Sequence, residues 1–358
     1  MLPARIISWT VLLTSALFIK IFSLFPLAVE RYYTNGVYQY IASVQRILFG
    51  WIPFSIGDFF YLVIGIYWLR QLIRFIISLY RGKSTKQVWL RGCKHVIFVI
   101  LLIYVLFNAL WGLNYNRLPM EQQMGLSLVT YSTQNLRTVL MELTVELNKI
   151  DSSSREYRAD LKRKRTLFQE AVETYRGASQ EFVTLRYKYS SVKPSLYSYL
   201  GNYLGFTGYY NPFSGEAQAN TTVPLFVQPF TTCHEIGHQL GYAKENEANF
   251  AGFLAARTSL NPAFKYSVYF DMYSYAIREM YVRDSMGTKT LMTRLKPNIT
   301  EDFRTIRQFY IKYQNPLEPV IRKLYGNYLR ANEQPAGMKS YNEVVAMLMA
   351  YRKKFGRI

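Results

Sequence analysis

Histidine and cysteine are scarce in this chain of 358 residues, which contains three histidines and two cysteines. Cys93 and Cys233 belong to different regions, so no disulfide framework is predicted, and we expect Cys233 to be a buried free thiol. Of the three histidines, His95 lies beside an apolar segment far upstream, whereas His234 and His238 are close together. A third histidine ligand downstream of this pair is therefore excluded.

The strongest chemical signal is the run His234-Glu235-Ile236-Gly237-His238. Residues four apart lie on one face of a helix, so both imidazoles can bind the same metal ion. Glu235 follows the first histidine and can act as a general base on a water molecule held by that ion. This His-Glu-x-x-His pattern predicts a Zn²⁺ site with His234 and His238 as metal ligands and Glu235 as the catalytic residue.

A helix-capping box is the structural alternative for Glu235, because Thr232 and Glu235 have the required spacing. A glutamate bound to the backbone would be a poor base. The histidine spacing favours catalysis, since the capping box requires the helix to begin unusually late in the motif.

Catalytic zinc usually takes three protein ligands and one water molecule, so one ligand is still missing. Gly241 is expected to end the zinc helix, and a second helix from about Lys244 to Arg257 would bring Glu245 and Glu247 back toward the metal. Because these glutamates are two residues apart, they point in different directions, and only one of them should bind.

The segment Glu245-Asn246-Glu247-Ala248-Asn249 resembles the Glu-x-x-Ala-Asp element of the gluzincin peptidases. The resemblance implies that Glu245 is the third metal ligand, with Glu247 as the reserve. It also implies that residue 249 supports a histidine ligand from the second shell. The family usually has aspartate at that position. Asn249 can accept a hydrogen bond from an imidazole N–H but adds no charge.

Three apolar stretches, at about residues 6–29, 56–79 and 96–113, predict three transmembrane helices before the metal motif. For the second stretch, an amphipathic helix at the membrane surface is the alternative. The first lacks a cleavage site of signal-peptide type and is expected to be retained. Basic residues between positions 81 and 94 place that loop in the cytoplasm. With three spans, the amino terminus is also cytoplasmic and the chain after about Asn114 lies outside.

The formal net charge is +20, but the basic residues concentrate in this loop and in a short tail at 352–357. No nucleic-acid-binding motif is present, so nucleic acid is not an expected partner. The expected partners are the lipid bilayer and a peptide or protein substrate. The sequence leaves the oligomeric state unknown.

The chain divides into a membrane region, residues 1–116, and an extracytoplasmic domain, residues 117–358, which we expect to be mainly α with a small β-sheet (α+β). Regularly spaced leucines predict a helix from about Asn135, broken at residues 151–154 and followed by a second helix. Aromatic residues and glycines between 195 and 213 predict short strands and turns. Residues 215–220 predict an edge strand, along which an extended substrate could bind.

Four segments resemble a family of bacterial membrane proteins described as domain of unknown function 3810. They are Pro53–Asp58, Trp111–Tyr115, Asn211–Ala217 and His234–Phe250. The resemblance covers nearly the whole chain. It implies a multi-pass protein of the bacterial inner membrane with a gluzincin-like zinc peptidase domain, and it implies no particular substrate.

Together these features predict a zinc metalloendopeptidase that hydrolyses peptide bonds outside the cytoplasm. Polar residues on both sides of the motif disfavour cleavage within the bilayer. A donor for the developing oxyanion has to be a tyrosine, arginine or lysine, and the residues that remain open are Tyr209, Tyr210, Tyr273 and Arg278. The alternative is a catalytically inactive zinc-binding scaffold or sensor at the membrane. The intact Glu235 argues against it, because a scaffold does not need a base.

Overall fold

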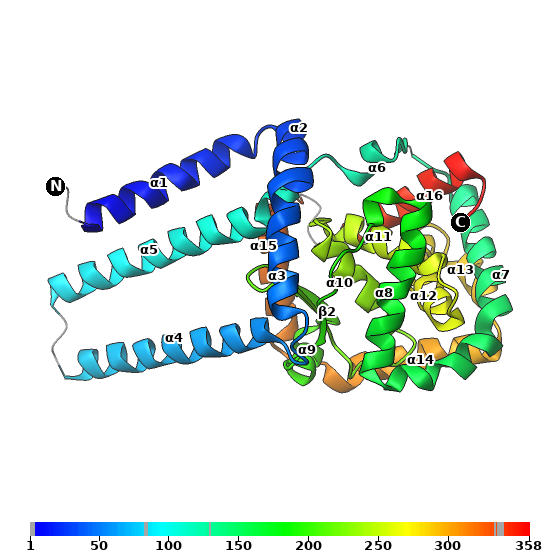
Figure 1. Cartoon of the computed structure of the whole chain (residues 1–358). Coiled ribbons are helices and arrows are strands. Elements are labelled where there is room, and N and C mark those ends of the chain that lie inside the picture. The colour runs from blue at the N-terminus through cyan, green and yellow to red at the C-terminus, as the bar shows by residue number, and fades with distance from the viewer. Residues whose placement is uncertain (1–3, 82–84, 129, 333, 335–339) are drawn as a thin grey trace.

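Three helices project from one side of a mainly helical body in the computed structural model of this chain (Figure 1). The structure describes residues 4–81, 85–128, 130–332, 334 and 340–358. The projecting helices are α1 (Ala4–Phe22), α4 (Ile56–Tyr80) and α5 (Lys86–Leu110). Helices α4 and α5 are long and apolar enough to cross a membrane, and a third span is added if α1 and the bent segment after it count as one. Residues 82–84 of the basic loop lie outside the described residues.

The predicted first span, residues 6–29, is wrong after Phe22. Helix α1 ends at Phe22, and the chain bends by 104° into the helical segment Pro26–Phe49. Pro26 begins this segment, at a position where a missing N–H costs nothing. The segment consists of α2 (Pro26–Ala28), the π-helix η1 (Val29–Val37) and α3 (Tyr38–Phe49). It runs across the ends of the projecting helices instead of continuing along them (Figure 1).

The predicted third span, residues 96–113, is also displaced. Helix α5 begins at Lys86, where the Thr85 side chain accepts a hydrogen bond from the backbone N–H of Val88. It ends at Leu110 and is followed by a 3₁₀ turn, η2 (Gly112–Asn116). The first turns of α5 are polar and basic, so the apolar stretch in the sequence begins later than the helix. Hydropathy depends on composition and does not locate helix boundaries.

A buried carboxylate fixes the beginning of α4 to the body. Glu216 accepts hydrogen bonds from the backbone N–H groups of Ile56 and Gly57 and from the hydroxyls of Ser55 and Ser214. The first N–H groups of a helix have no partner within the helix and favour a negative charge. A Cβ atom at Gly57 would lie 2.6 Å from Ser214 Oγ, so the close approach of helix and body requires glycine.

The body is mainly α-helical with one small sheet, as the sequence predicts. Its helices are α6 (Met120–Gln123), α7 (Thr133–Arg158), α8 (Lys164–Glu181), α9 (Ser198–Leu204), α10 (Gln228–Gln239), α11 (Glu245–Arg257), α12 (Pro262–Arg283), α13 (Ser285–Met292), α14 (Pro297–Tyr313), α15 (Glu318–Ala331) and α16 (Ser340–Phe355); short 3₁₀ turns are η3 (Asp160–Lys162) and η4 (Val183–Leu185). The leucine stripe of α7 is fully buried in the core that also contains α12.

The predicted helix break at residues 151–154 is wrong, because α7 continues to Arg158. The serines there are accommodated by bonding back along the helix, as Ser154 Oγ does to the carbonyl oxygen of Asp151. The Asp151 carboxylate pairs with Arg155 one turn later. The interruption comes instead at η3.

The sheet contains β1 (Val192–Pro194), β2 (Gly208–Asn211) and β3 (Glu216–Ala219) in the order β1-β3-β2. Strand β3 pairs in parallel with β1 and antiparallel with β2. The prediction that residues 215–220 form an edge strand is therefore wrong: β3 is central and β2 is an edge. The other predicted strand region contains α9, so only its later part is a strand.

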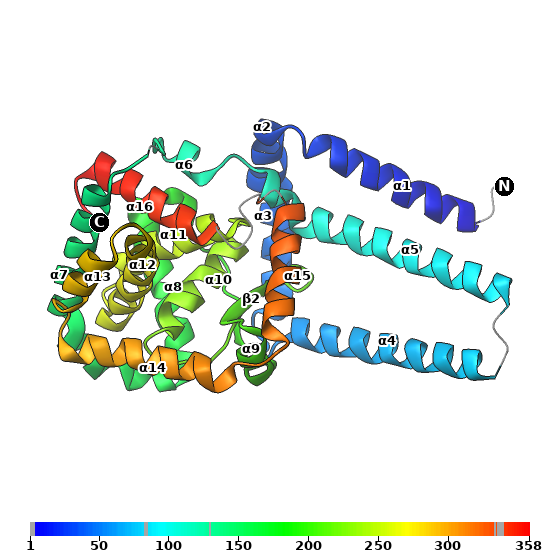
Figure 2. The ribbon, with the colours of Figure 1, turned by 180° about the vertical axis from the view of Figure 1, so that it is seen from behind.

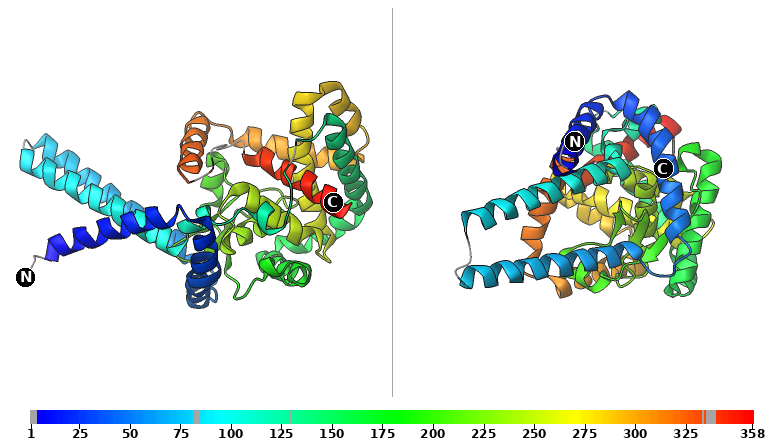
Figure 3. Two further views of the ribbon diagram at one scale, coloured as in Figure 1. Left: turned by 90° about the horizontal axis from the view of Figure 1, so that it is seen from above. Right: turned by 60° about the vertical axis from the view of Figure 1, so that its left-hand side comes forward.

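Two helices lie across the body-side ends of the projecting helices. Figures 2 and 3 show α3 and α15 at the same level along the molecule, one on each side of the place where α4 and α5 meet the body. Tyr38, at the start of α3, is buried and donates a hydrogen bond to the carbonyl oxygen of Gln239 at the end of α10. Helix α3 is thus packed directly on the helix that carries the His-Glu-x-x-His motif.

Candidate metal centre

Helix α10 begins a full turn before the motif. Pro229 occupies its first turn, and the Thr232 hydroxyl donates to the carbonyl oxygen of Gln228. The capping-box alternative for Glu235 is therefore wrong, because the helix does not begin at Thr232. At the other end, Gly241 has φ +85°, and a Cβ atom there would lie 3.0 Å from Asn114 Oδ1. This glycine allows the tight turn that leads into α11.

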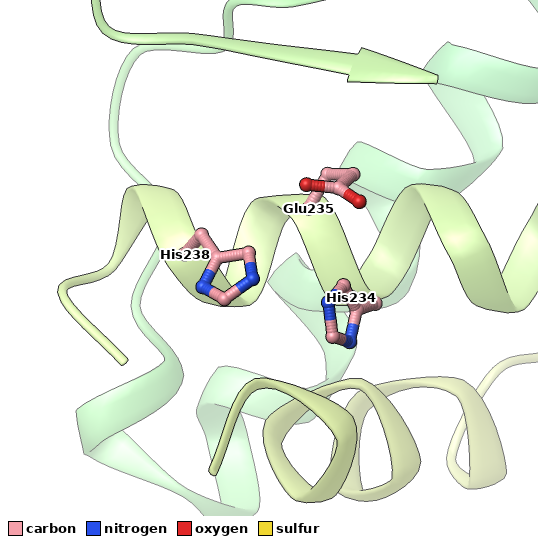
Figure 4. Close-up of side chains that lie close together, drawn as sticks. All are labelled: His234, Glu235 and His238. Atoms are coloured by element: carbon pink, nitrogen blue, oxygen red, sulfur yellow. The ribbon is translucent and has the colours of Figure 1, made fainter. Parts of the chain in front are cut away.

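Both imidazole rings are oriented by hydrogen bonds at Nδ1. His238 Nδ1 lies 2.8 Å from the carbonyl oxygen of Tyr242, and His234 Nδ1 lies 2.9 Å from Asn249 Oδ1. An acceptor at Nδ1 holds the proton there and leaves Nε2 as the atom that can bind a metal. The ring centroids are 4.7 Å apart. Figure 4 shows both rings on the side of α10 that faces a neighbouring helix.

Glu245, the first residue of α11, lies against both Nε2 atoms. Its Oε2 is 3.4 Å from His234 Nε2, and its Oε1 is 3.8 Å from His238 Nε2. Ligand atoms about 2.0 Å from a tetrahedral zinc ion are about 3.3 Å from one another, so each imidazole lies near ligand spacing from one oxygen of the same carboxylate. Among the described residues, the group whose ligand atoms all lie within 4.8 Å of one another is His234, Glu235 and His238, and Glu245 is not part of it. The Tyr325 hydroxyl donates to Glu245 Oε1 at 2.6 Å.

Glu247 lies apart from this cluster. Its Oε1 accepts a hydrogen bond from the backbone N–H of Met120 at 3.1 Å. The carboxylate is buried, which raises its pKa, while the charges of Lys244 and Arg117 oppose that rise. The structure thus brings Glu245 to the histidines and turns Glu247 toward the first residue of α6.

Small residues at the crossing of α10 and α11 permit this arrangement. A Cβ atom at Gly237 would lie 3.1 Å from the carbonyl oxygen of Ala248, and one at Gly252 would lie 3.2 Å from the backbone nitrogen of His234. Larger side chains at either position would separate the two helices. Glu245 and Asn249 reach the histidines because the backbones pass this closely.

Glu235 lies on the other side of α10, toward the sheet (Figure 4). The donor atoms of His234, Glu235 and His238 lie within 4.8 Å of one another. Glu235 is 3% exposed, and burial raises its pKa to about 8, against the opposing effect of His234. Its Oε2 has no hydrogen-bond partner among the described residues. This carboxylate is therefore close to the histidines yet uncommitted to any structural contact at Oε2.

The charges of the metal-free cluster are strongly coupled. Burial alone would lower the pKa of His234 and raise that of Glu245, but the hydrogen bond between them moves both the other way, to about 9 and about 2. Burial and the neighbouring His234 lower the pKa of His238 to about 4. Glu245 is thus anionic and His238 neutral, which are the forms in which these side chains bind metals, whereas His234 is protonated and has to release a proton when a metal binds.

A cavity of about 1030 Å³ opens onto the cluster and is lined by His234, Glu235, His238 and Glu245 among others. Arg278 also lines it, whereas Tyr273 is fully buried in the core. The Tyr209 hydroxyl donates to Asp58 Oδ1 at 2.5 Å and is thereby engaged in holding α4.

Tyr325 is the residue near the cluster that sequence reasoning missed. It lines the same cavity, and its hydroxyl contacts Glu245 from helix α15, eighty positions further along the chain. A single tyrosine among 31 carries no local signal of such a contact.

A family model described as "Protein of unknown function (DUF3810)" matches residues 33–349. No curated protein and no solved structure matches the chain.

Proposed function

The chain belongs to the family of proteins of unknown function DUF3810, and from the site itself we propose that it is a membrane-anchored zinc metallopeptidase that hydrolyses peptide bonds of protein or peptide substrates outside the cytoplasm. The observation that supports this most directly is the convergence of His234 Nε2, His238 Nε2 and the Glu245 carboxylate beside the uncommitted Glu235. The donor set of two imidazoles and one carboxylate is one that catalytic zinc uses.

Bound zinc would supply Lewis-acid polarisation of the scissile carbonyl and an acidified water molecule. Glu235 takes one proton from the attacking water. As the water oxygen bonds to the carbonyl carbon and the C–N bond breaks, Glu235 passes that proton to the leaving amine nitrogen. Its burial favours this role, because a carboxyl group with a raised pKa both accepts and releases a proton near neutral pH.

The substrate backbone would bind along β2. This strand lies at the edge of the sheet, whereas residues 215–220, predicted as the edge strand, include the central strand β3. Gly208, Tyr209 and Tyr210 of this strand line the cavity beside Glu235. An extended peptide can add to the free edge of an antiparallel pair through main-chain hydrogen bonds. Of the oxyanion donors proposed from the sequence, Arg278 and Tyr210 both line this cavity, and both are retained for this role.

The membrane placement forms part of the proposal. Helices α1, α4 and α5 project on the same side of the body (Figure 1), as three spans of one bilayer require. The predicted basic loop, residues 81–94, is mostly the beginning of α5, because Lys86, Arg91 and Lys94 lie in this helix. By the positive-inside rule, this end of α5 lies on the cytoplasmic side. The amino terminus lies there too, and the body lies on the outer side of the bacterial inner membrane.

Substituting Gly208 by alanine should reduce peptide hydrolysis about a hundred-fold while the metal content stays unchanged. A Cβ atom at this position would lie 2.5 Å from Glu235 Oε1 and 2.9 Å from the carbonyl oxygen of Gln218. Both distances are under 3.0 Å, so the Glu235 side chain has to move and β2 has to shift slightly against β3. The measurement is the initial hydrolysis rate together with metal per chain. Gly177→Ala is the control, because nothing lies within 4 Å of its added Cβ.

The proposed function is tested on the full-length protein purified in detergent. Metal content is measured by mass spectrometry, and a mixed peptide library is incubated with the protein before and after removal of the metal by a chelator. We expect about one zinc per chain, cleavage that stops on chelation and cleavage that returns with zinc. Zinc without cleavage would favour the inactive scaffold or sensor. Absence of bound metal would reject the site.

A further inference from the structure

We propose that the substrate is a polypeptide anchored in the same membrane, which is cut close to the bilayer surface. This inference rests on the proposed peptidase function and adds the substrate class. It comes from three observations: the metal cluster is fixed to the end of a candidate span, the cavity reaches both candidate spans, and the helix that closes the cavity has an exposed apolar face.

The metal cluster is packed directly on the end of α5. Trp111 follows the last residue of this helix, and its indole Nε1 donates to the carbonyl oxygen of His238 at 3.0 Å. The Trp111 and His238 rings are 5.9 Å apart and meet edge to face. A metal held by His238 therefore lies within about one side-chain length of the end of the candidate span.

The cavity extends from the metal cluster to both candidate spans. Its lining includes Tyr61, in the second turn of α4, and Phe107, in the last turn of α5. Its volume of about 1030 Å³ is at the upper end of the range typical of ligand pockets. A chain that emerges from the bilayer beside α4 and α5 would therefore be close to the residues that line this space.

Helix α15 borders the cavity with one face and exposes an apolar stripe beside it, and Tyr328 belongs to both. Tyr325 and Leu329 face inward: Tyr325 contacts Glu245, and Leu329 is fully buried. The stripe, whose members recur at helical spacing, consists of Leu317 (65% exposed), Val320 (56%), Leu324 (62%) and Tyr328 (39%). Exposed apolar residues repeated in this way indicate a face that is covered by something apolar.

The stripe is turned toward the spans. Tyr328, at one end of it, lies 3.3 Å from the hydroxyl of Tyr115, in the turn that follows α5. The exposed basic residues Lys323 and Arg330 lie on the same helix, seven residues apart and therefore both to one side of the stripe. A helix that has an apolar face, exposed basic residues and an axis across the spans fits the headgroup region of a bilayer. The occupant we assign to this stripe is therefore the lipid surface.

Helix α3 has a matching face at the same level (Figures 1 and 3). Its exposed apolar residues also follow helical spacing and are Tyr40, Val44, Ile47 and, just after the helix, Trp51. Tyrosine and tryptophan are characteristic of the membrane–water interface. Two helices with exposed apolar residues thus lie at one level on opposite sides of α4 and α5, and the cavity between the metal cluster and these helices includes Tyr61 and Phe107.

The consequence is a limit on where a substrate can be cut. An extended chain advances about 3.3 Å per residue, so ten residues cover about 33 Å. Because the metal cluster adjoins the span end, the cleaved bond should lie within about ten residues of the point where an anchored substrate leaves the bilayer. A soluble protein has no anchor that would bring it to this cavity, so we expect it to be cleaved more slowly than an anchored one.

The first test uses the full chain in proteoliposomes with a substrate that serves as a ruler. A single hydrophobic anchor is followed by identical copies of a peptide that the purified enzyme cleaves in the library, and the cut sites are mapped by mass spectrometry. We expect copies within about ten residues of the anchor to be cut at least about ten-fold faster than copies about forty residues away. Equal cutting along the ruler, or faster cutting far from the anchor, would overturn the inference and leave the peptidase function intact. Cleavage of neither library nor ruler would reject both.

The second test asks whether the stripe touches lipid, independently of catalysis. In a Cys93→Ser background, Leu324→Cys carries a fluorescent probe, and lipids with a nitroxide near the headgroup act as quencher. The control is Met286→Cys on α13, an exposed position (71%) at the end of the body far from the spans (Figure 1). We expect strong quenching at position 324 and little at position 286. Equal, weak quenching at both positions would show that α15 faces water or a protein partner and would overturn the assignment.

Discussion

Substitution of Glu235 by glutamine should abolish peptide hydrolysis, with a loss of at least about a hundred- to ten-thousand-fold, while the bound metal remains. The amide has nearly the same shape but cannot accept the proton of the attacking water. Glu235 makes no contact with the metal in the proposed mechanism, and its Oε2 has no partner among the described residues that the substitution would disturb. The measurements are the hydrolysis rate on a library-selected peptide and metal per chain.

The stability of this variant is a second, independent readout. Burial raises the pKa of Glu235 to about 8, which means that its charged form is disfavoured in the folded protein. The neutral amide avoids that cost, so the melting temperature of Glu235→Gln should equal or exceed that of the wild type. Retained hydrolysis would show that Glu235 is not the base. Lost metal would show that it is a ligand, a role that its position beside both histidines also permits.

The sequence predicted the parts of the site that depend on helical spacing. His234 and His238 project from the same side of α10, and Glu245 begins the next helix, one residue after the predicted start. These placements follow from the periodicity of the helix and from the glycine that ends it, both of which are local properties. The same reasoning left Glu245 and Glu247 open, because the choice depends on how α11 crosses α10.

The residues that sequence reasoning missed approach the site from distant parts of the chain. Gly208 borders Glu235 because β2 crosses α10, and Tyr325 reaches Glu245 from α15. Neither contact has a local sequence signature. The error in the first span has a related cause: hydropathy stayed high across residues 23–29 although the chain bends there, since apolar composition does not report direction.

The four segments that suggested the family meet around the site. Glu216 binds the beginning of α4 at Gly57, and Trp111 binds the carbonyl oxygen of His238. Residues widely separated along the chain therefore connect both candidate spans to the sheet and to the helix that carries the histidines. We infer that the segments share one structural task, which is to hold the candidate metal centre at a set position relative to the candidate spans.

Zinc affinity distinguishes Glu245 from Glu247 as the third metal ligand. Glu245→Gln should lower zinc affinity by more than about a hundred-fold, which exceeds the ten- to hundred-fold typical of a residue that only supports a ligand. The substitution removes a negative ligand and leaves two imidazoles. Asn249→Ala should fall within the smaller range, because Asn249 orients His234 without contacting the metal. The measurement is competition for zinc against a chromophoric chelator with detergent-purified protein.

Glu247→Gln is the matched control, since it makes the same chemical change two residues away. Its carboxylate accepts a hydrogen bond from the backbone of Met120 and lies apart from the imidazoles, so zinc affinity should stay within a few-fold of the wild type. Circular dichroism checks that each variant is folded. If Glu247→Gln loses zinc and Glu245→Gln keeps it, Glu247 is the third ligand. If both keep it, the third ligand is Glu235, and the proposed division between base and ligand fails.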